Sequence, residues 1–141
     1  MKRSIIVLLA VLSVLVLLLA ACGGGNSTDK TEDKVPDQYV SQTNPFSGKA
    51  DAADAGKAVY QTNCASCHGD SGKGDGPAGA NLNPKPADLT EPAKNDSDGQ
   101  ILWHVSEGAA AGEPGSAMPA WKGTLTQDQI WQVITYLRTL K

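Results

Sequence analysis

Apolar residues in this chain form one continuous run near the N-terminus and, after a polar interval, three stripes with helical spacing. The continuous run covers residues 5–21 and is broken only by Ser13. The polar interval offers too little apolar surface to offset the entropy cost of ordering. The pattern therefore predicts a leader at residues 1–21, a flexible tether at residues 22–47 and a folded domain at residues 48–141.

The three stripes of the folded domain predict three helices. The first covers residues 50–63. The second begins near Ser97 and ends at Gly108, residue types that favour helix starts and stops. The third begins at Thr126, where Gln129 three residues later completes a capping-box pattern. The stripes expected to face the core are Ala52, Ala55 or Gly56, and Val59 or Tyr60; then Ile101, Leu102 and Val105; then Ile130, Val133 or Ile134, and Leu137.

The first and last helices are expected to cross. Gly56 lies in a helix interior, where glycine costs roughly 1 kcal/mol relative to alanine, which favours a role in close helix–helix approach. The expected crossing brings Gly56 and Tyr60 against Tyr136 or Leu137. No parallel-sheet pattern appears in the chain.

Charge narrows the classes of partner. The 141 residues include 12 basic and 15 acidic ones, a net charge of −3. Loss of Lys2 and Arg3 with the leader would leave five more acidic than basic residues. This balance argues against nucleic acid, which requires a basic patch, and permits docking to a basic partner.

The leader has the layout of a secretory signal, a basic start followed by a short apolar core. It ends in the sequence LAACG, residues 19–23, which resembles the lipobox of bacterial lipoproteins. That resemblance implies cleavage before Cys22 and diacylglycerol on its thiol. The alternative is an uncleaved anchor, although 17 residues is at the lower end of the spanning range. Either way the domain is expected outside the cytoplasm and tied to a bacterial membrane, most simply at the periplasmic face of the cytoplasmic membrane.

The tether contains two aromatic residues, Tyr39 and Phe46. As a coil, about 25 residues would reach roughly 25–30 Å, enough to swing between membrane-bound partners. In the competing interpretation, residues 35–40 and 44–46 lie along a partner subunit.

The strongest chemical signal is the C-x-x-C-H motif formed by Cys64, Cys67 and His68. At this spacing two thiols attach one c-type haem and the histidine ligates its iron. A thioredoxin-like dithiol would need a βαβ context, and a structural zinc site would need four ligands. Neither fits this chain, so one covalent haem c is predicted.

The sixth haem ligand is predicted to be Met118, in a glycine-rich loop before Pro119. A thioether raises the potential relative to bis-histidine ligation. His104 is the alternative, on the second predicted helix. The extended stretch 81–89 is expected to offer a carbonyl to Nδ1 of His68, framed by either Pro77 or Pro84.

These motifs together resemble a class I cytochrome c of bacterial type. The resemblance covers residues 48–141 and rests on C-x-x-C-H-G, on the GDGP loop at 74–77 with PKPADL at 84–89, on MPAW at 118–121 and on the last helix. It implies an all-α fold, a small helical bundle around one covalently attached haem. The tethered architecture also resembles the mono-haem subunit of alternative complex III, a membrane quinol oxidoreductase.

The function expected from these features is one-electron transfer without catalysis, because His68 and Met118 together leave the iron no open site. The partners would be redox proteins at the membrane surface, met either by a tethered shuttle or within a stable multi-subunit oxidoreductase. A haem peroxidase or gas sensor is the alternative, and it requires an open or histidine-ligated sixth site.

Overall fold

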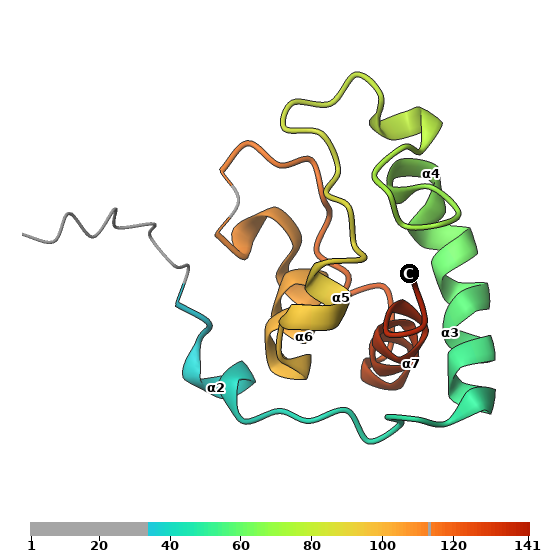
Figure 1. Ribbon diagram of the computed structural model, residues 1–141. Helices are drawn as coiled ribbons and strands as arrows, with labels where there is room; N and C mark the ends of the chain where they lie inside the picture. The colour runs from blue at the N-terminus through green and yellow to red at the C-terminus, as the bar shows by residue number, and fades with distance from the viewer. Residues whose placement is uncertain (1–33, 113) are drawn as a thin grey trace, which may run out of the picture. The chain divides into compact units, whose positions relative to one another are not determined.

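A computed structural model describes residues 34–112 and 114–141, and the regular structure of these residues is entirely helical (Figure 1). This confirms the predicted all-α class. The elements are α2 (Asp37–Val40), α3 (Ala50–Asn63), α4 (Ala65–His68), the 3₁₀ turn η1 (Pro77–Gly79), α5 (Pro92–Asn95), α6 (Asp98–Glu107), the 3₁₀ turn η2 (Gly108–Ala110) and α7 (Gln127–Leu137). The predicted leader and the predicted lipidation site, Cys22, lie outside the described residues. None of the helices within the described ranges combines the length and the hydropathy needed to cross a membrane.

The three predicted helices are confirmed as α3, α6 and α7, and local signals account for their ends. The Ser97 side chain caps α6 by accepting from the backbone N–H of Gln100 at 3.1 Å. At α7 the capping box is complete: Thr126 Oγ1 accepts from the Gln129 N–H at 3.2 Å, and Gln129 Oε1 accepts from the Thr126 N–H at 2.9 Å. Each cap satisfies backbone donors that a helix start leaves unpaired.

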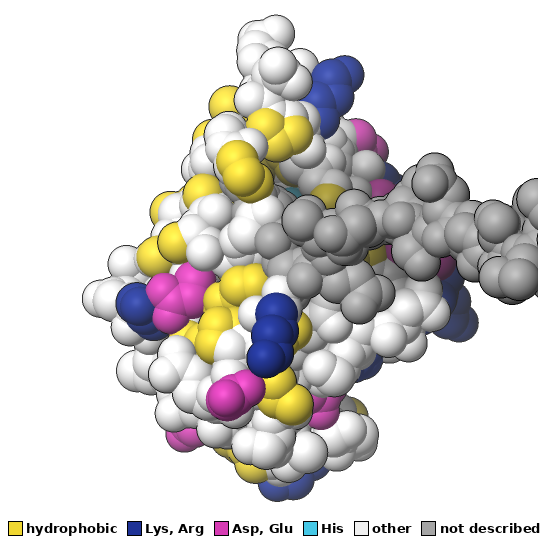
Figure 2. All heavy atoms as spheres, turned by 90° about the vertical axis from the view of Figure 1, so that its left-hand side faces the viewer, with side chains coloured by type: hydrophobic (Ala, Val, Ile, Leu, Met, Phe, Trp, Pro, Cys, Tyr) yellow, Lys and Arg dark blue, Asp and Glu magenta, His cyan; other side chains and the backbone are white. Residues whose placement is uncertain are grey.

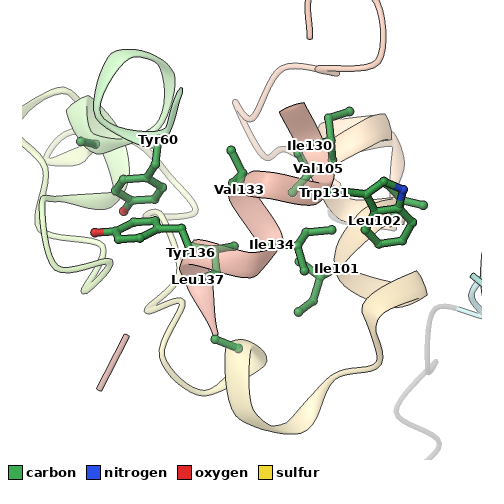
Figure 3. Packing of buried hydrophobic residues seen from close by; sticks show 12 residues of the cluster. Tyr60, Ile101, Leu102, Val105, Ile130, Trp131, Val133, Ile134, Tyr136 and Leu137 are labelled. Atoms are coloured by element: carbon green, nitrogen blue, oxygen red, sulfur yellow. The ribbon is translucent and has the colours of Figure 1, made fainter. Parts of the chain in front are cut away.

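Helix α7 packs against both α3 and α6. Figure 3 shows Ile101 and Leu102 of α6 beside Ile134 of α7, and Tyr60 of α3 facing Tyr136 of α7. Ile134 and Tyr60 have no exposed surface. Burying an aliphatic or aromatic side chain of this size stabilises a fold by about 1.5–3 kcal/mol, so these contacts hold the three helices together.

The crossing of α3 and α7 agrees in part with the prediction. The rings of Tyr60 and Tyr136 meet with centroids 5.2 Å apart and planes tilted by 54°, as expected. Gly56, however, meets α7 about one turn earlier than predicted. A Cβ on Gly56 would lie 1.9 Å from the carbonyl oxygen of Gln132, so only glycine fits at this crossing.

Residues 34–47, which the sequence analysis assigns to the tether, pack on the helices of the domain. Among the described residues, contacts with these helices begin before the predicted boundary at residue 48. Asn44 accounts for this, since it is only 8% exposed and its amide donates to the carbonyl of Trp131 at 3.1 Å and to Oγ1 of Thr135 at 2.9 Å. Its backbone N–H donates to Asp98 Oδ2 at 3.0 Å. Buried polar groups require such partners, so this asparagine fixes the segment to α6 and α7.

The two aromatic residues of this segment also lie against the domain. In the alternative interpretation they lie along a partner subunit. Tyr39 and Phe46 are partly buried against the hydrophobic core. The Tyr39 hydroxyl donates to Glu107 Oε1 at 2.6 Å, while Lys122 Nζ lies 2.6 Å from Glu107 Oε2. Glu107 thus joins α2, the end of α6 and the chain that follows Met118.

Acid is expected to loosen this junction. The hydrogen bond from Lys122, and after it the one from Tyr39, lowers the pKa of Glu107 below its ordinary value of 4.5. A lowered carboxyl pKa contributes stability that is present above the ordinary value and is lost as pH falls through the folded-state pKa. The free energy of unfolding in urea should therefore decrease more between pH 6 and pH 3 for the wild type than for Glu107→Gln. Equal losses in the two proteins would show that the junction contributes nothing.

Candidate cofactor site

The C-x-x-C-H residues lie on one continuous helical turn at the end of α3. Cys64 closes α3, and its N–H donates to the Tyr60 carbonyl at 2.8 Å. Helix α4 continues from there, with the Cys67 and His68 N–H groups donating to the Cys64 carbonyl at 3.1 and 2.9 Å. Both cysteines are free thiols and are partly buried. The helix therefore places two cysteine side chains and the imidazole in one small region.

The environment of Cys64 disfavours its thiolate. Burial, and to a lesser degree Cys67, raises the pKa of Cys64 to about 11. Reactive cysteines of disulfide oxidoreductases instead have a lowered pKa. In the described part of the chain, no group of three or more His, Cys, Asp or Glu side chains could hold a metal ion. The raised pKa of Cys64 therefore gives no support to a redox-active thiolate at this position.

A glycine-rich loop, residues 69–79, lies against the backbone of the motif. The Gly74 N–H donates to the His68 carbonyl at 2.9 Å, and the Gly76 N–H donates to the Cys67 carbonyl at 3.1 Å. A Cβ on Gly76 would lie 2.5 Å from the Ser66 carbonyl oxygen. The glycines thus allow a close approach, and the two hydrogen bonds fix the backbone of the motif.

The His68 ring is oriented by a backbone carbonyl. Its Nδ1 lies 3.2 Å from the carbonyl oxygen of Ala87. Because a carbonyl oxygen only accepts, this contact assigns the proton to Nδ1 and the lone pair to Nε2. The stretch 81–89 supplies this carbonyl as predicted, but the residue before it is Pro86 and not Pro77 or Pro84. Sequence reasoning missed Ala87 because a backbone acceptor carries no side-chain signal.

Met118 lies in a loop fixed to the end of α6. Its carbonyl accepts from the Ala109 N–H at 2.9 Å, and its own N–H donates to Ser116 Oγ at 3.3 Å. A Cβ on Gly108, which has φ +57°, would lie 2.4 Å from the carbonyl carbon of Pro119. The Met118 side chain is partly buried against the hydrophobic core. The backbone around this methionine is therefore held independently of its sulfur.

His104 packs against its neighbour on α6. The rings of Trp103 and His104 have centroids 5.0 Å apart and are tilted by 40°. In the view of Figure 1, the segment 81–89 lies between α4 and the loop 114–121. The pairing of Met118 with His68 across one haem, in preference to His104, stays a prediction.

The chain matches the protein family described as cytochrome C oxidase, cbb3-type, subunit III, over residues 51–137. It belongs to this family. The chain is also 28% identical over 103 residues to the cbb3-type cytochrome c oxidase subunit CcoP of Azospirillum brasilense. That alignment covers 73% of this chain and 33% of the relative, so the chain spans about a third of the length of the curated protein it matches.

Membership of the cbb3-type subunit III family supports electron transfer by a c-type cytochrome and implies covalently bound haem c. The residues present fit such a group. Cys64 and Cys67 lie on one helical turn without a disulfide between them, and His68 Nδ1 contacts the Ala87 carbonyl. This arrangement has the residue types that thioether attachment and ligation through Nε2 require.

Figure 2 shows one face of the domain, on which hydrophobic side chains lie between acidic and basic ones. Lys or Arg side chains and Asp or Glu side chains are interspersed there. The excess of acidic residues in the chain is therefore not gathered into a single patch on this face.

Proposed function

We propose that the protein carries single electrons through one haem c attached to Cys64 and Cys67, with His68 and Met118 as axial ligands. The observation that carries the proposal is the His68 ring, oriented by the Ala87 carbonyl beside two free thiols. The sequence contains one C-x-x-C-H motif, which supports a single haem.

When bound, the haem supplies the Fe(III)/Fe(II) couple. The protein's own residues hold and tune it. Cys64 and Cys67 would form the thioethers, and His68 would present Nε2. Met118 would occupy the sixth position and exclude small ligands, so the protein is proposed to be an electron carrier and not itself a catalyst.

We further propose that the domain works at the outer face of a bacterial membrane, held there by lipid on Cys22. The LAACG sequence supports the lipid, and two acyl chains suffice for stable anchoring. The similarity to a cbb3-type oxidase subunit favours a place in a multi-subunit membrane oxidoreductase. The tethered architecture also agrees with the mono-haem subunit of alternative complex III. Detergent extraction followed by size exclusion separates these proposals from a shuttle, since a shuttle should elute alone.

The absorption spectrum of the purified protein tests the proposed function. We expect haem that stays with the denatured chain, and a weak far-red band in the oxidised protein from thioether ligation. Haem that dissociates on denaturation would contradict the attachment to Cys64 and Cys67. Covalent haem without the far-red band would contradict Met118 as ligand and would favour the peroxidase or sensor alternative.

A further inference from the structure

The Ala87 carbonyl lies in a short segment that the glycine-rich loop holds on both sides. The Leu89 N–H donates to the Gly72 carbonyl at 2.7 Å. Before Ala87, the Pro86 carbonyl oxygen approaches Gly74 so closely that a Cβ there would lie 2.2 Å from it. The peptide groups on either side of Ala87 therefore have little freedom to rotate.

Asp88 follows this carbonyl directly, and both oxygens of its carboxylate have partners. Oδ1 accepts from the Thr90 N–H at 2.9 Å and from the Thr90 hydroxyl at 2.6 Å. Oδ2 lies 3.8 Å from Lys73 Nζ, in the same glycine-rich loop. Thr90 is only 3% exposed, so its side chain has a fixed place in the domain. The carboxylate thus links a buried residue after Ala87 to the loop that covers the C-x-x-C-H motif.

The contacts of Asp88 with Lys73 and with Thr90 differ in strength. The Lys73 pair is exposed on both sides, and exposed ion pairs contribute little. The two bonds to Thr90 are short and involve a charged acceptor, which makes them the stronger kind. They also hold the pKa of Asp88 below its ordinary value, the hydroxyl of Thr90 being the largest cause. Thr90 is therefore the partner that fixes Asp88.

We propose that Asp88 is a positioning residue for His68: its carboxylate, held by Thr90, fixes the peptide that aims the Ala87 carbonyl at Nδ1. The inference rests on the proposed function, in which His68 ligates the iron through Nε2. A carbonyl well aimed at Nδ1–H increases the basicity of the imidazole. A more basic axial ligand favours the ferric state, so with haem bound Asp88 would lower the reduction potential through His68.

Asp88→Ala tests this role through the Nδ1 proton. In the reduced, ¹⁵N-labelled protein, that proton should exchange with solvent about fivefold to tenfold faster than in the wild type, the change expected when one hydrogen bond of ordinary strength is lost. The reduction potential should rise at the same time. Asp88→Asn keeps an oxygen that can accept from the Thr90 N–H, so it should restore most of both properties. If Asp88 only stabilised the fold, the exchange rate and the potential would not change in Asp88→Ala and return in Asp88→Asn in this way.

Glu91→Ala is the matched control. It also removes a carboxylate, one that pairs with Lys94 at 3.3 Å on the surface of α5, three residues from Asp88. It should leave the exchange rate and the potential unchanged. The proposal is overturned if Asp88→Ala behaves like the wild type, or if Glu91→Ala shifts both readouts equally.

If Asp88→Ala does not fold, Thr90→Val replaces it. This variant removes the hydroxyl bond of 2.6 Å and keeps the carboxylate, so exchange should accelerate in the same direction. An unchanged rate would overturn the proposal. A separate measurement on the wild type tests the proposed function itself. If the haem does not shift the NMR signal of the His68 imidazole, His68 is not the ligand.

Discussion

Replacing Met118 with alanine should leave the haem attached but lower its reduction potential and open the iron to carbon monoxide. The proposed attachment depends on Cys64, which closes α3, and on Cys67 of α4, and neither residue lies in the methionine loop. The thioether is a soft ligand that stabilises ferrous iron, so its loss favours the ferric state. The decrease should be a sizeable part of the roughly 0.8 V range over which axial ligands set haem potentials. Potentiometric titration and carbon monoxide binding to the reduced protein measure the two effects.

The loop should keep its place in this variant, so the effect is specific to the sulfur. The backbone of residue 118 is held by hydrogen bonds to Ala109 and Ser116. Three residues later, the Trp121 N–H donates to the Val105 carbonyl at 3.2 Å. None of these bonds involves the methionine side chain. Circular dichroism and the thermal midpoint should therefore change far less than the potential.

His104→Ala is the control, because it removes the only other histidine of the sequence. It should change neither the potential nor carbon monoxide binding, since the His104 ring packs on Trp103. The assignment of Met118 is wrong if its variant keeps the wild-type potential and stays closed to carbon monoxide. A lowered or raised potential and new carbon monoxide binding in His104→Ala alone would transfer the role of ligand to His104.

The sequence predicts those parts of the fold that short-range signals determine. Helix α3 has the predicted bounds, residues 50–63, because its alanine-rich stripe ends in the C-x-x-C-H motif. The beginnings of α6 and α7 follow from Ser97 and Thr126, whose side chains cap backbone groups three residues away. All of these interactions lie within one helical turn, so a single sequence is enough to recognise them.

The sequence does not predict parts that depend on distant partners. Asn44 looks like a tether residue, yet its bonds to Trp131 and Thr135 join positions 87 and 91 residues apart. The carbonyl of Ala87 contacts an imidazole 19 residues away and has no side-chain signal. Within the candidate site, the residues of C-x-x-C-H could be named because their types are unusual. The backbone groups that orient these residues could be identified only from the structure.

Gly56→Ala should be the most destabilising single-methyl change at the helix crossing. The new Cβ would lie 1.9 Å from the Gln132 carbonyl oxygen and 2.9 Å from the Val133 nitrogen, both backbone atoms that no rotamer change can move. Overpacking of this kind typically costs 1–3 kcal/mol, occasionally more, whereas alanine gains only about 1 kcal/mol in helix propensity. Because the contact of 1.9 Å puts the cost at the upper end of that range, we expect a net loss of about 2 kcal/mol. For a domain of this size, such a loss lowers the thermal midpoint by about 8–16 °C.

Gly123→Ala is the matched control, since a Cβ at Gly123 would meet nothing within 4 Å. Its stability should stay within about 0.5 kcal/mol of the wild type. A Gly56→Ala protein as stable as this control would show that α3 and α7 do not cross as closely as the structure indicates.

The displacement of α3 in Gly56→Ala should also reach the haem motif, because Tyr60 lies one turn after Gly56 and its hydroxyl donates to the Gly69 carbonyl at 2.7 Å. A shift of α3 therefore moves the residue that follows His68, so Gly56→Ala should change the far-red absorption as well as the stability, whereas Gly123→Ala should change neither.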